Sequence, residues 1–243
     1  MPFTQFHSEP EKGIIEYSNI IISTYSMDYD MWIDTCIFGL VIQSLHFMGL
    51  TKLISEYLYY EHGITYRNFY ETLIEFAKNN PETIFGKCIS EISYKLSAEK
   101  RGEYISRMHI NPIFGNIEYQ LEEGIALEVT KEYDTFFEEL LPAFRSFGFR
   151  EEAFGEILRY QRLSVRRLGD KEKHGTFSYD IHKYFWDISV GKYTPLSQKE
   201  NTLVFTNLYP TSTYQEYAKY NVWYGRKETK TLYLEKEISV VEG

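Results

Sequence analysis

Cysteine is scarce in this chain, with two residues among 243. The two thiols, Cys36 and Cys88, stand far apart in the sequence. A 4Fe–4S cluster that keeps one iron open for chemistry needs three closely spaced cysteine thiolates. Two distant cysteines cannot supply that set, and no Cys/His spacing typical of a zinc site is present either. The chain by itself therefore lacks the ligands of an iron–sulfur enzyme or of a zinc protein.

Long apolar runs are also missing. The longest, Cys36–Ile42, is far shorter than the roughly 20 residues that a membrane-spanning helix needs. Residues 1–13 are polar and contain no apolar segment typical of a signal peptide. These absences predict a soluble, cytoplasmic protein without a membrane span.

Positive charge is in deficit, since the formal net charge is −9. That balance argues against non-specific nucleic-acid binding, which relies on Lys and Arg to neutralise phosphates. One basic cluster falls at the end of a predicted helix and consists of Arg159, Arg162, Arg166, Arg167 and Lys171. Cations suit the dipole at a helix C-terminus, so we favour a solvated helix end over a phosphate site. No glycine-rich phosphate loop, GxGxxG, GxSxG or DxHxxG motif occurs.

Aromatic residues, in contrast, are abundant at 17%, with 22 Tyr and 17 Phe. Because aromatic side chains bury large areas and are rare in disordered chains, this content predicts a well-packed core. The apolar periodicity predicts an α+β fold that is predominantly helical, with a bundle-like first half, a few short strands and a mixed C-terminal third.

The first half begins with a predicted strand and continues as helices. The β-branched run at 19–25 predicts a buried strand, and Ser26 is the expected N-cap of a central helix that ends at Gly49. Val41 and Leu45 are expected deep in the core. Three more helices are predicted, at 51–62, from Thr65 to 79, and at 82–100.

Glycine and proline at 102–120 predict the boundary between two lobes, 1–101 and 102–243, which we expect to pack as one unit. The second lobe should contain helices at 130–146 and 150–167, with Pro142 kinking or ending the first. The last third predicts strands at 176–180, 202–207 and 231–241 and helices at 182–190 and 212–223.

Histidines are the remaining candidates for chemistry. His46 follows Gln43 by three residues, which places both near one face of the central helix. They would form a polar pair lining a substrate cavity, or His46 would be a hydrogen-bonded interior histidine. His182 stands near Asp180 as a candidate acid–base pair, although such proximity in sequence is common. Paired glutamates at 122–123, 138–139 and 151–152 are explained by solvation. No residue is predicted to be catalytic.

Several segments of the sequence resemble a known protein family. Ile20–Met27, then Trp32 and the run Phe38–Thr51 with its Gln-x-x-His pattern, resemble the C-terminal accessory region that follows the barrel in B12-binding-domain radical SAM proteins. Gly63–Tyr70 and Val222–Lys227 are similar to the same region. The resemblance implies an accessory domain that holds substrate or docks on a radical SAM core, with Tyr25, Trp32, Gln43 and His46 as substrate-contacting candidates.

The modules that bind SAM, the 4Fe–4S cluster and cobalamin in that family have no counterpart in this sequence. We therefore expect no cofactor on this chain and a radical SAM/B12-binding core as its partner, in cis or in trans. The chain would then be a fragment, a split subunit or a separately encoded domain. The alternative is a stand-alone interaction or scaffold protein without catalysis. A detached accessory domain should expose an apolar patch at 20–32 that includes Tyr25, Met27 or Trp32. The alternative is that the chain's own helices cover this strand fully.

Overall fold

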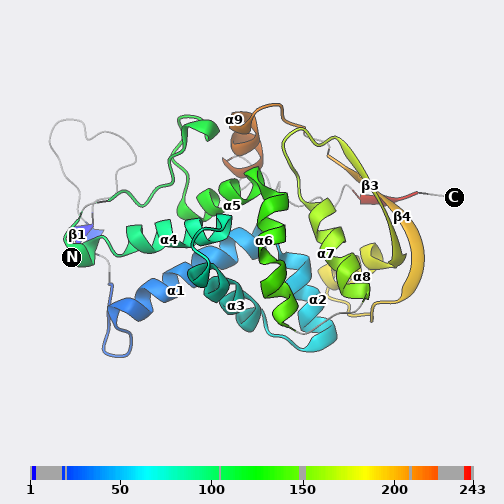
Figure 1. The fold of residues 1–243 in the computed structure, drawn as a ribbon, viewed down its shortest axis with the longest axis horizontal. Coiled ribbons are helices and arrows are strands. Elements are labelled where there is room, and N and C mark those ends of the chain that lie inside the picture. The colour runs from blue at the N-terminus through cyan, green and yellow to red at the C-terminus, as the bar shows by residue number, and fades with distance from the viewer. Residues whose placement is uncertain are drawn as a thin grey trace.

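The computed structural model describes residues 2–3, 18–19, 21–103, 105–147, 152–207, 210–223 and 238–241. As predicted, the fold is α+β and predominantly helical (Figure 1). The first half contains the strands β1 (Pro2–Phe3) and β2 (Ser18–Asn19), then α1 (Tyr29–Val41), the π-helix η2 (Ile42–Phe47), α2 (Lys52–His62), α3 (Tyr66–Asn79), α4 (Ile84–Leu96) and the short η3 (Glu99–Arg101).

The second half begins with a short 3-10 helix and ends in a small sheet. Its elements are η4 (Pro112–Phe114), α5 (Leu121–Lys131), α6 (Tyr133–Ser146), α7 (Glu152–Ser164), β3 (Glu172–Tyr179), α8 (Ile181–Ser189), β4 (Gln198–Thr206), α9 (Tyr214–Tyr217), the π-helix η5 (Ala218–Trp223) and β5 (Ile238–Val240).

Local capping chemistry sets the helix boundaries of the first half. The side chain of Thr65 accepts a hydrogen bond from the N–H of Asn68 at the start of α3, and Thr83 does the same for Gly86 in α4. Gly63 ends α2 in the left-handed conformation, at φ 69°. The predicted helix at 51–62 and the helix start at Thr65 are therefore confirmed.

The predicted strand at 19–25 is wrong for residues 21–25, which form no strand, whereas Asn19 lies in β2 and residue 20 lies outside the described residues. Ser18–Asn19 pairs with Pro2–Phe3, and the chain then turns tightly, with an isolated bridge between Thr24 and Met27. The side chains of Ile21 and Tyr25 are exposed. A β-branched run forms a strand only where a neighbouring strand pairs with it, and no strand in the described part of the chain pairs with residues 21–25. The N-cap of α1 is consequently Asp28, which accepts from the N–H of Met31, and not Ser26.

The second half adds one helix to the prediction and narrows another. The helix α5 was not predicted, since the glycine and proline before it suggested a loop up to residue 120. The helix α6 continues past Pro142 to Ser146, so the proline does not end it, and the kink stays a prediction. The carbonyl that Pro142 leaves without an N–H donor belongs to Glu138, and both residues are exposed, so water can satisfy it.

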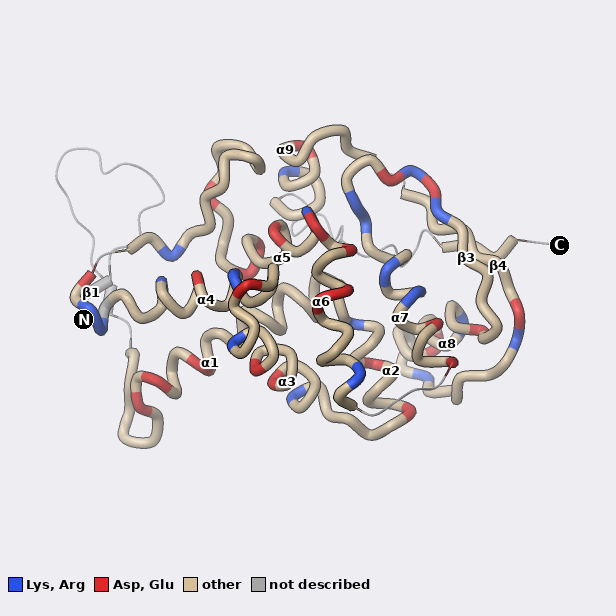
Figure 2. The backbone as a smooth tube through the Cα atoms, viewed as in Figure 1, with Lys and Arg blue, Asp and Glu red and all other residues tan. Residues whose placement is uncertain are grey.

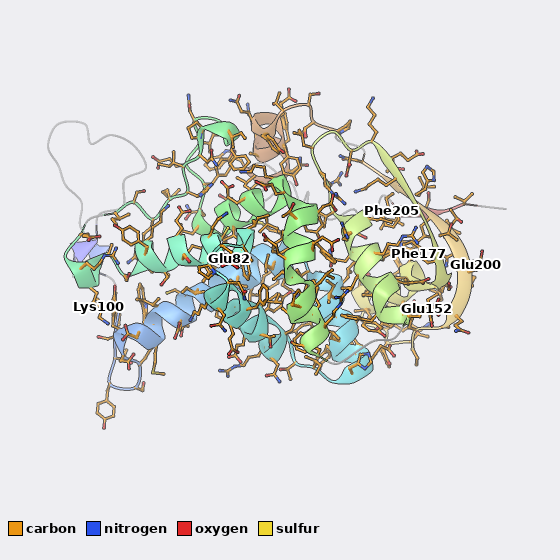
Figure 3. The ribbon with its side chains drawn as sticks, viewed as in Figure 1. Glu82, Lys100, Glu152, Phe177, Glu200 and Phe205 are labelled. Atoms are coloured by element: carbon orange, nitrogen blue, oxygen red, sulfur yellow. The ribbon has the colours of Figure 1, made fainter. Side chains whose placement is uncertain are left out.

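The sheet is three-stranded and antiparallel, in the order β3-β4-β5, and α7 and α8 lie against one of its faces (Figure 1). Phe177 of β3 and Phe205 of β4 point to this face (Figure 3), where both rings pack on Tyr160 of α7 at 5.6 and 5.5 Å. Of the predicted final strand 231–241, only Ile238–Val240 is a strand within the described residues, and 231–237 lies outside them.

One contiguous hydrophobic core joins the two predicted lobes, so buried residues before and after residue 102 share it. The fully buried Val41 and Leu45 confirm that the end of the first long helix is central. The lobe boundary itself stays a prediction. Within the described residues no single helix is long and apolar enough to cross a membrane, although α1 with η2 and α2 together reach that length and composition across a 93° bend.

Positions of Lys and Arg are interspersed with positions of Asp and Glu along the described backbone (Figure 2). Two members of the predicted basic cluster are held in ion pairs: Arg162 contacts Asp134 at 2.7 Å and Glu138 at 2.6 Å, and Arg167 contacts Asp134 at 2.5 Å. Arg166 is buried and donates to Asn207 at 2.7 Å. The cluster is therefore not the solvated helix end that was predicted, since Arg166 is buried and Arg162 and Arg167 are half-buried beside their partners.

Candidate functional site

The first long helix widens into the π-helix η2, and His46 lies in this segment. A π-helical turn accommodates an extra residue relative to an α-helix and occurs frequently at functional sites. The hydroxyl of Ser44 donates to the carbonyls of Leu40 and Val41, at 2.8 and 3.2 Å, at the point where the helix changes. Leu45 is fully buried beside it, which leaves His46 to face the neighbouring helices.

A single ring nitrogen of His46 contacts two other helices. Its Nδ1 lies 3.2 Å from Ser55 Oγ on α2 and 3.1 Å from the Tyr70 hydroxyl on α3. The Tyr70 hydroxyl is also 3.3 Å from Thr51 Oγ1. Ser55 in turn donates to the carbonyl of Lys52 at 2.7 Å. This hydroxyl network therefore fixes the orientation of the imidazole.

Aromatic rings surround the same histidine. Tyr66 meets it edge-on with ring centroids 5.2 Å apart, and Tyr59 stacks on Tyr66 at 4.9 Å. The ring of Phe47 also meets it edge-on, with centroids 5.5 Å apart. The side chains of Phe47 and Tyr59 are 70% and 42% exposed, whereas His46 is half-buried. His46 thus lies below a partly exposed aromatic rim.

Burial controls the protonation of this group. It lowers the pKa of His46 to about 4, and the nearby Lys52 contributes in the same direction. Burial also raises the pKa of Tyr66 and of Tyr70, so both phenols remain protonated. At neutral pH the site consists of an uncharged imidazole with one N–H and one lone pair, together with phenolic hydroxyls.

This arrangement suits hydrogen bonding better than nucleophilic catalysis. Ser55 is fully buried and its hydroxyl already donates to a carbonyl, so it is not accessible to a substrate as a nucleophile. Within the described part of the chain, no carboxylate hydrogen-bonds to His46 and no partner lies on its Nε2. That nitrogen is therefore the atom available to a polar group of a ligand.

The other predicted site residues do not converge on His46. Gln43 is exposed while His46 is half-buried, because a π-helix closes its hydrogen bonds at i→i+5 and residues three positions apart no longer share a face. Trp32 stands 14 positions earlier, about 21 Å along a helix, stacked on Tyr29 at 5.7 Å with Arg107 over its ring. Tyr25 is fully exposed in the turn before α1.

His182 has a different partner from the one that its sequence neighbourhood suggests. Its Nδ1 lies 3.1 Å from the Tyr160 hydroxyl, and burial lowers its pKa against the opposing effect of Asp180. A niche of about 10 Å³, enough for one water, adjoins it and is also lined by Lys52 and Glu56 of α2. The same helix therefore separates His46 from His182.

A second charged cluster surrounds Glu128. Its carboxylate lies 3.2 Å from His109 Nε2, accepts from Asn111 at 2.6 Å and pairs with Lys131 at 3.1 Å. Although burial acts in the opposite direction, these hydrogen bonds lower the pKa of Glu128 to about 2. Among the described residues, no set of three or more His, Cys, Asp or Glu side chains is placed to hold a metal ion.

Sequence reasoning missed the partners of His46, namely Thr51, Ser55, Tyr66 and Tyr70. A partial signal existed, because Thr65 fixes the start of α3 and puts Tyr66 and Tyr70 on one face at i, i+4 spacing. No pattern in the sequence of α3 or η2 indicates that this face of α3 contacts η2.

Comparisons with known proteins give a limited similarity. No family model matches the chain. It is 34% identical over 71 residues, or 29% of its length, to the cobalamin-dependent radical SAM methyltransferase TokK of Streptomyces tokunonensis. The same identity and length hold for a 2-(S-pantetheinyl)-carbapenam-3-carboxylate methyltransferase of Streptantibioticus cattleyicolor. In each case the match covers 10% of the relative's length. This similarity supports an association with cobalamin-dependent radical SAM methyltransferases over that segment.

Proposed function

We propose that this chain is an accessory domain that holds substrate for, or docks on, a cobalamin-dependent radical SAM core. The observation that carries the proposal is the 71-residue similarity to TokK in a chain with two cysteines. Those cysteines cannot supply the three thiolates that an open 4Fe–4S cluster needs. SAM, the cluster and cobalamin would accordingly be bound by the partner core, whether in cis or in trans.

The site around His46 supports the substrate-holding part of this proposal. Its Nε2 and the exposed rings of Phe47 and Tyr59 offer one polar contact beside apolar surface. Ligand sites commonly combine such aromatic walls with a few fixed polar groups. Holding a substrate requires no catalytic residue on this chain.

The docking part of the proposal rests on exposed side chains at and just before the start of α1. Tyr25 and Ile21 are 109% and 72% exposed, and Met31 is 53% exposed. The patch expected at 20–32 is therefore present in part, since Tyr25 belongs to it while Met27 is half-buried and Trp32 is buried. Exposed aromatic and aliphatic side chains of this kind are typical anchors of a protein interface.

The test is reconstitution with a radical SAM, cobalamin-binding core encoded beside this chain. We expect the two proteins to co-elute and methyl transfer to rise at least about tenfold when the chain is present. A His46→Gln variant should weaken substrate retention without changing association, whereas Ile21→Ser/Tyr25→Ser should weaken association. Unchanged methylation and no co-elution would contradict the proposal.

A stand-alone interaction or scaffold protein remains the second candidate, because the same exposed residues would serve any partner. It predicts no association with the core and no effect of His46→Gln on any methyl transfer. The Ile21→Ser/Tyr25→Ser variant would then affect binding to other proteins alone.

A further inference from the structure

An open groove of about 600 Å³ runs between α1 and α3. Phe38 and Ile74 are its apolar residues. The remaining lining consists of Asp34, Thr35, Arg67, Glu71, Glu75 and Lys78. The groove is separate from the His46 hydroxyl network, none of whose members lines it.

The two helices that form the groove run antiparallel. Lys78, at the end of α3, pairs with Asp34 near the start of α1 at 2.8 Å, while Tyr70 meets His46 beyond the end of α1 at 3.1 Å. Met31 continues the outer face of α1 one turn before Thr35, and it is 53% exposed. From Met31 to the exposed Phe47, the helical segment is about 24 Å long.

The backbone of both helices is already paired internally, so the groove offers side-chain contacts alone. Even the hydroxyl of Thr35 donates to the carbonyl of Met31, at 2.8 Å. An extended peptide gains affinity from main-chain hydrogen bonds to a partner, and this groove has none to give. A helix makes its backbone hydrogen bonds internally and needs only side-chain contacts from a partner. A helix therefore fits this groove, since it can pack between the two helices that form it.

The charges that line the groove indicate which charged side chains the bound helix should have. The lining contains three carboxylates and two cations, and both cations are committed: Lys78 to Asp34, and Arg67 to Glu71 at 2.8 Å. Glu75 has no ion-pair partner within the described residues. The helix α1 has two aspartates and no basic residue. A cationic side chain on the occupant would gain an attraction here, while an anionic one, or a nucleic acid, would be repelled.

We propose that the groove between α1 and α3 is a docking site for an amphipathic helix of a partner protein, with an apolar stripe seated on Phe38 and Ile74 and Lys or Arg beside Glu75. The occupant is defined by this chemistry and does not depend on the proposed function.

Two synthetic peptides of about 18 residues, which span about 27 Å as helices, test the proposal. They share one apolar stripe at i, i+3, i+4 and i+7 and differ in having Lys or Glu on its flanks. Fluorescence anisotropy with the full chain should show that the Lys peptide binds at least about tenfold more tightly than the Glu peptide. Thr35→Lys/Glu75→Lys changes the charge of the lining from −1 to +2 and should reverse this preference.

The matched control is Gln198→Lys/Glu200→Lys on β4, at the far end of the molecule from α1 (Figure 3). It adds the same charge and should leave both affinities unchanged. If the double variant unfolds, Glu75→Gln takes its place, because it changes one exposed side chain only. This variant should weaken binding of the Lys peptide and leave binding of the Glu peptide unchanged. Equal binding of the two peptides, absence of binding, or equal effects of groove and control variants would each overturn the proposal.

Discussion

His46 and Tyr70 are joined by a contact of 3.1 Å between Nδ1 and the phenolic hydroxyl, which ties η2 to α3. Replacing Tyr70 with Phe removes a fully buried hydroxyl that also faces Thr51 and Ser55. Urea unfolding should show a loss of about 1–3 kcal/mol, since buried polar partners are left unsatisfied. Tyr94→Phe is the control. Because the ring of Tyr94 is exposed, this substitution should lower the free energy of unfolding by no more than about 0.5 kcal/mol. Equal losses would mean that the network does not stabilise the fold.

The depressed pKa of His46 makes stability depend on pH. The folded pKa of about 4 lies below the ordinary value of 6.5, so between these values the unfolded chain binds more protons. Stability should therefore rise with pH across this window, and the contribution is complete above about 6.5 and lost as the pH falls towards 4. The slope due to His46 is at most about 1.4 kcal/mol per pH unit.

Imidazole proton chemical shifts, followed by NMR from pH 3 to 8, would measure the midpoint of His46 directly. Denaturant unfolding of His46→Gln over the same range should lack the His46 contribution, while other histidines still titrate. A midpoint near the ordinary value would show that the imidazole is more hydrated than its half-buried position indicates.

Leu45 and Phe47 provide a matched pair within one π-helix. Leu45 is fully buried, so Leu45→Ala should cost about 2–5 kcal/mol in unfolding free energy. Phe47 is 70% exposed, and Phe47→Ala should cost less than about 1 kcal/mol. The reverse order would mean that the face of η2 directed to the core had been assigned incorrectly.

Two helical glycines should respond to alanine with opposite signs. A Cβ on Gly124 of α5 would lie 2.5 Å from the ring of His109, whose backbone is held by hydrogen bonds to Tyr119 at 2.7 and 2.9 Å. Gly124→Ala should therefore destabilise by about 1–3 kcal/mol. At Gly155 of α7 nothing lies within 4 Å, so Gly155→Ala should stabilise by about 0.5–1 kcal/mol. Thermal and urea unfolding of the two variants would compare them.

The cysteine content leads to a cofactor prediction. Anaerobic incubation of the purified chain with iron and sulfide should give no stoichiometric 4Fe–4S absorbance and no cleavage of SAM. Burial raises the pKa of the Cys88 thiol to about 12 and that of Cys36 as well, which disfavours the thiolate form that iron requires. Stoichiometric cluster formation on the isolated monomer would contradict this prediction.

The sequence by itself determined the features that depend on neighbours along the chain. Thr65 and Thr83 cap their helices through N–H groups three residues later, and Gly63 adopts the positive φ that ends α2. The apolar periodicity located Val41 and Leu45 in the core. The caps and the αL glycine act through groups at most a few residues away, which is why sequence alone can indicate them.

Contacts between distant segments were decided by the tertiary structure alone. Residues 21–25 have strand-forming side chains, but no strand among the described residues pairs with them, and the chain turns at Thr24–Met27 instead. The π-helical register separated Gln43 from His46, and packing of α2 and α3 supplied Ser55 and Tyr70 as partners of the imidazole. The groove between α1 and α3 exists because two antiparallel helices lie side by side. Such contacts depend on how whole helices pack, and local residue preferences do not encode that packing.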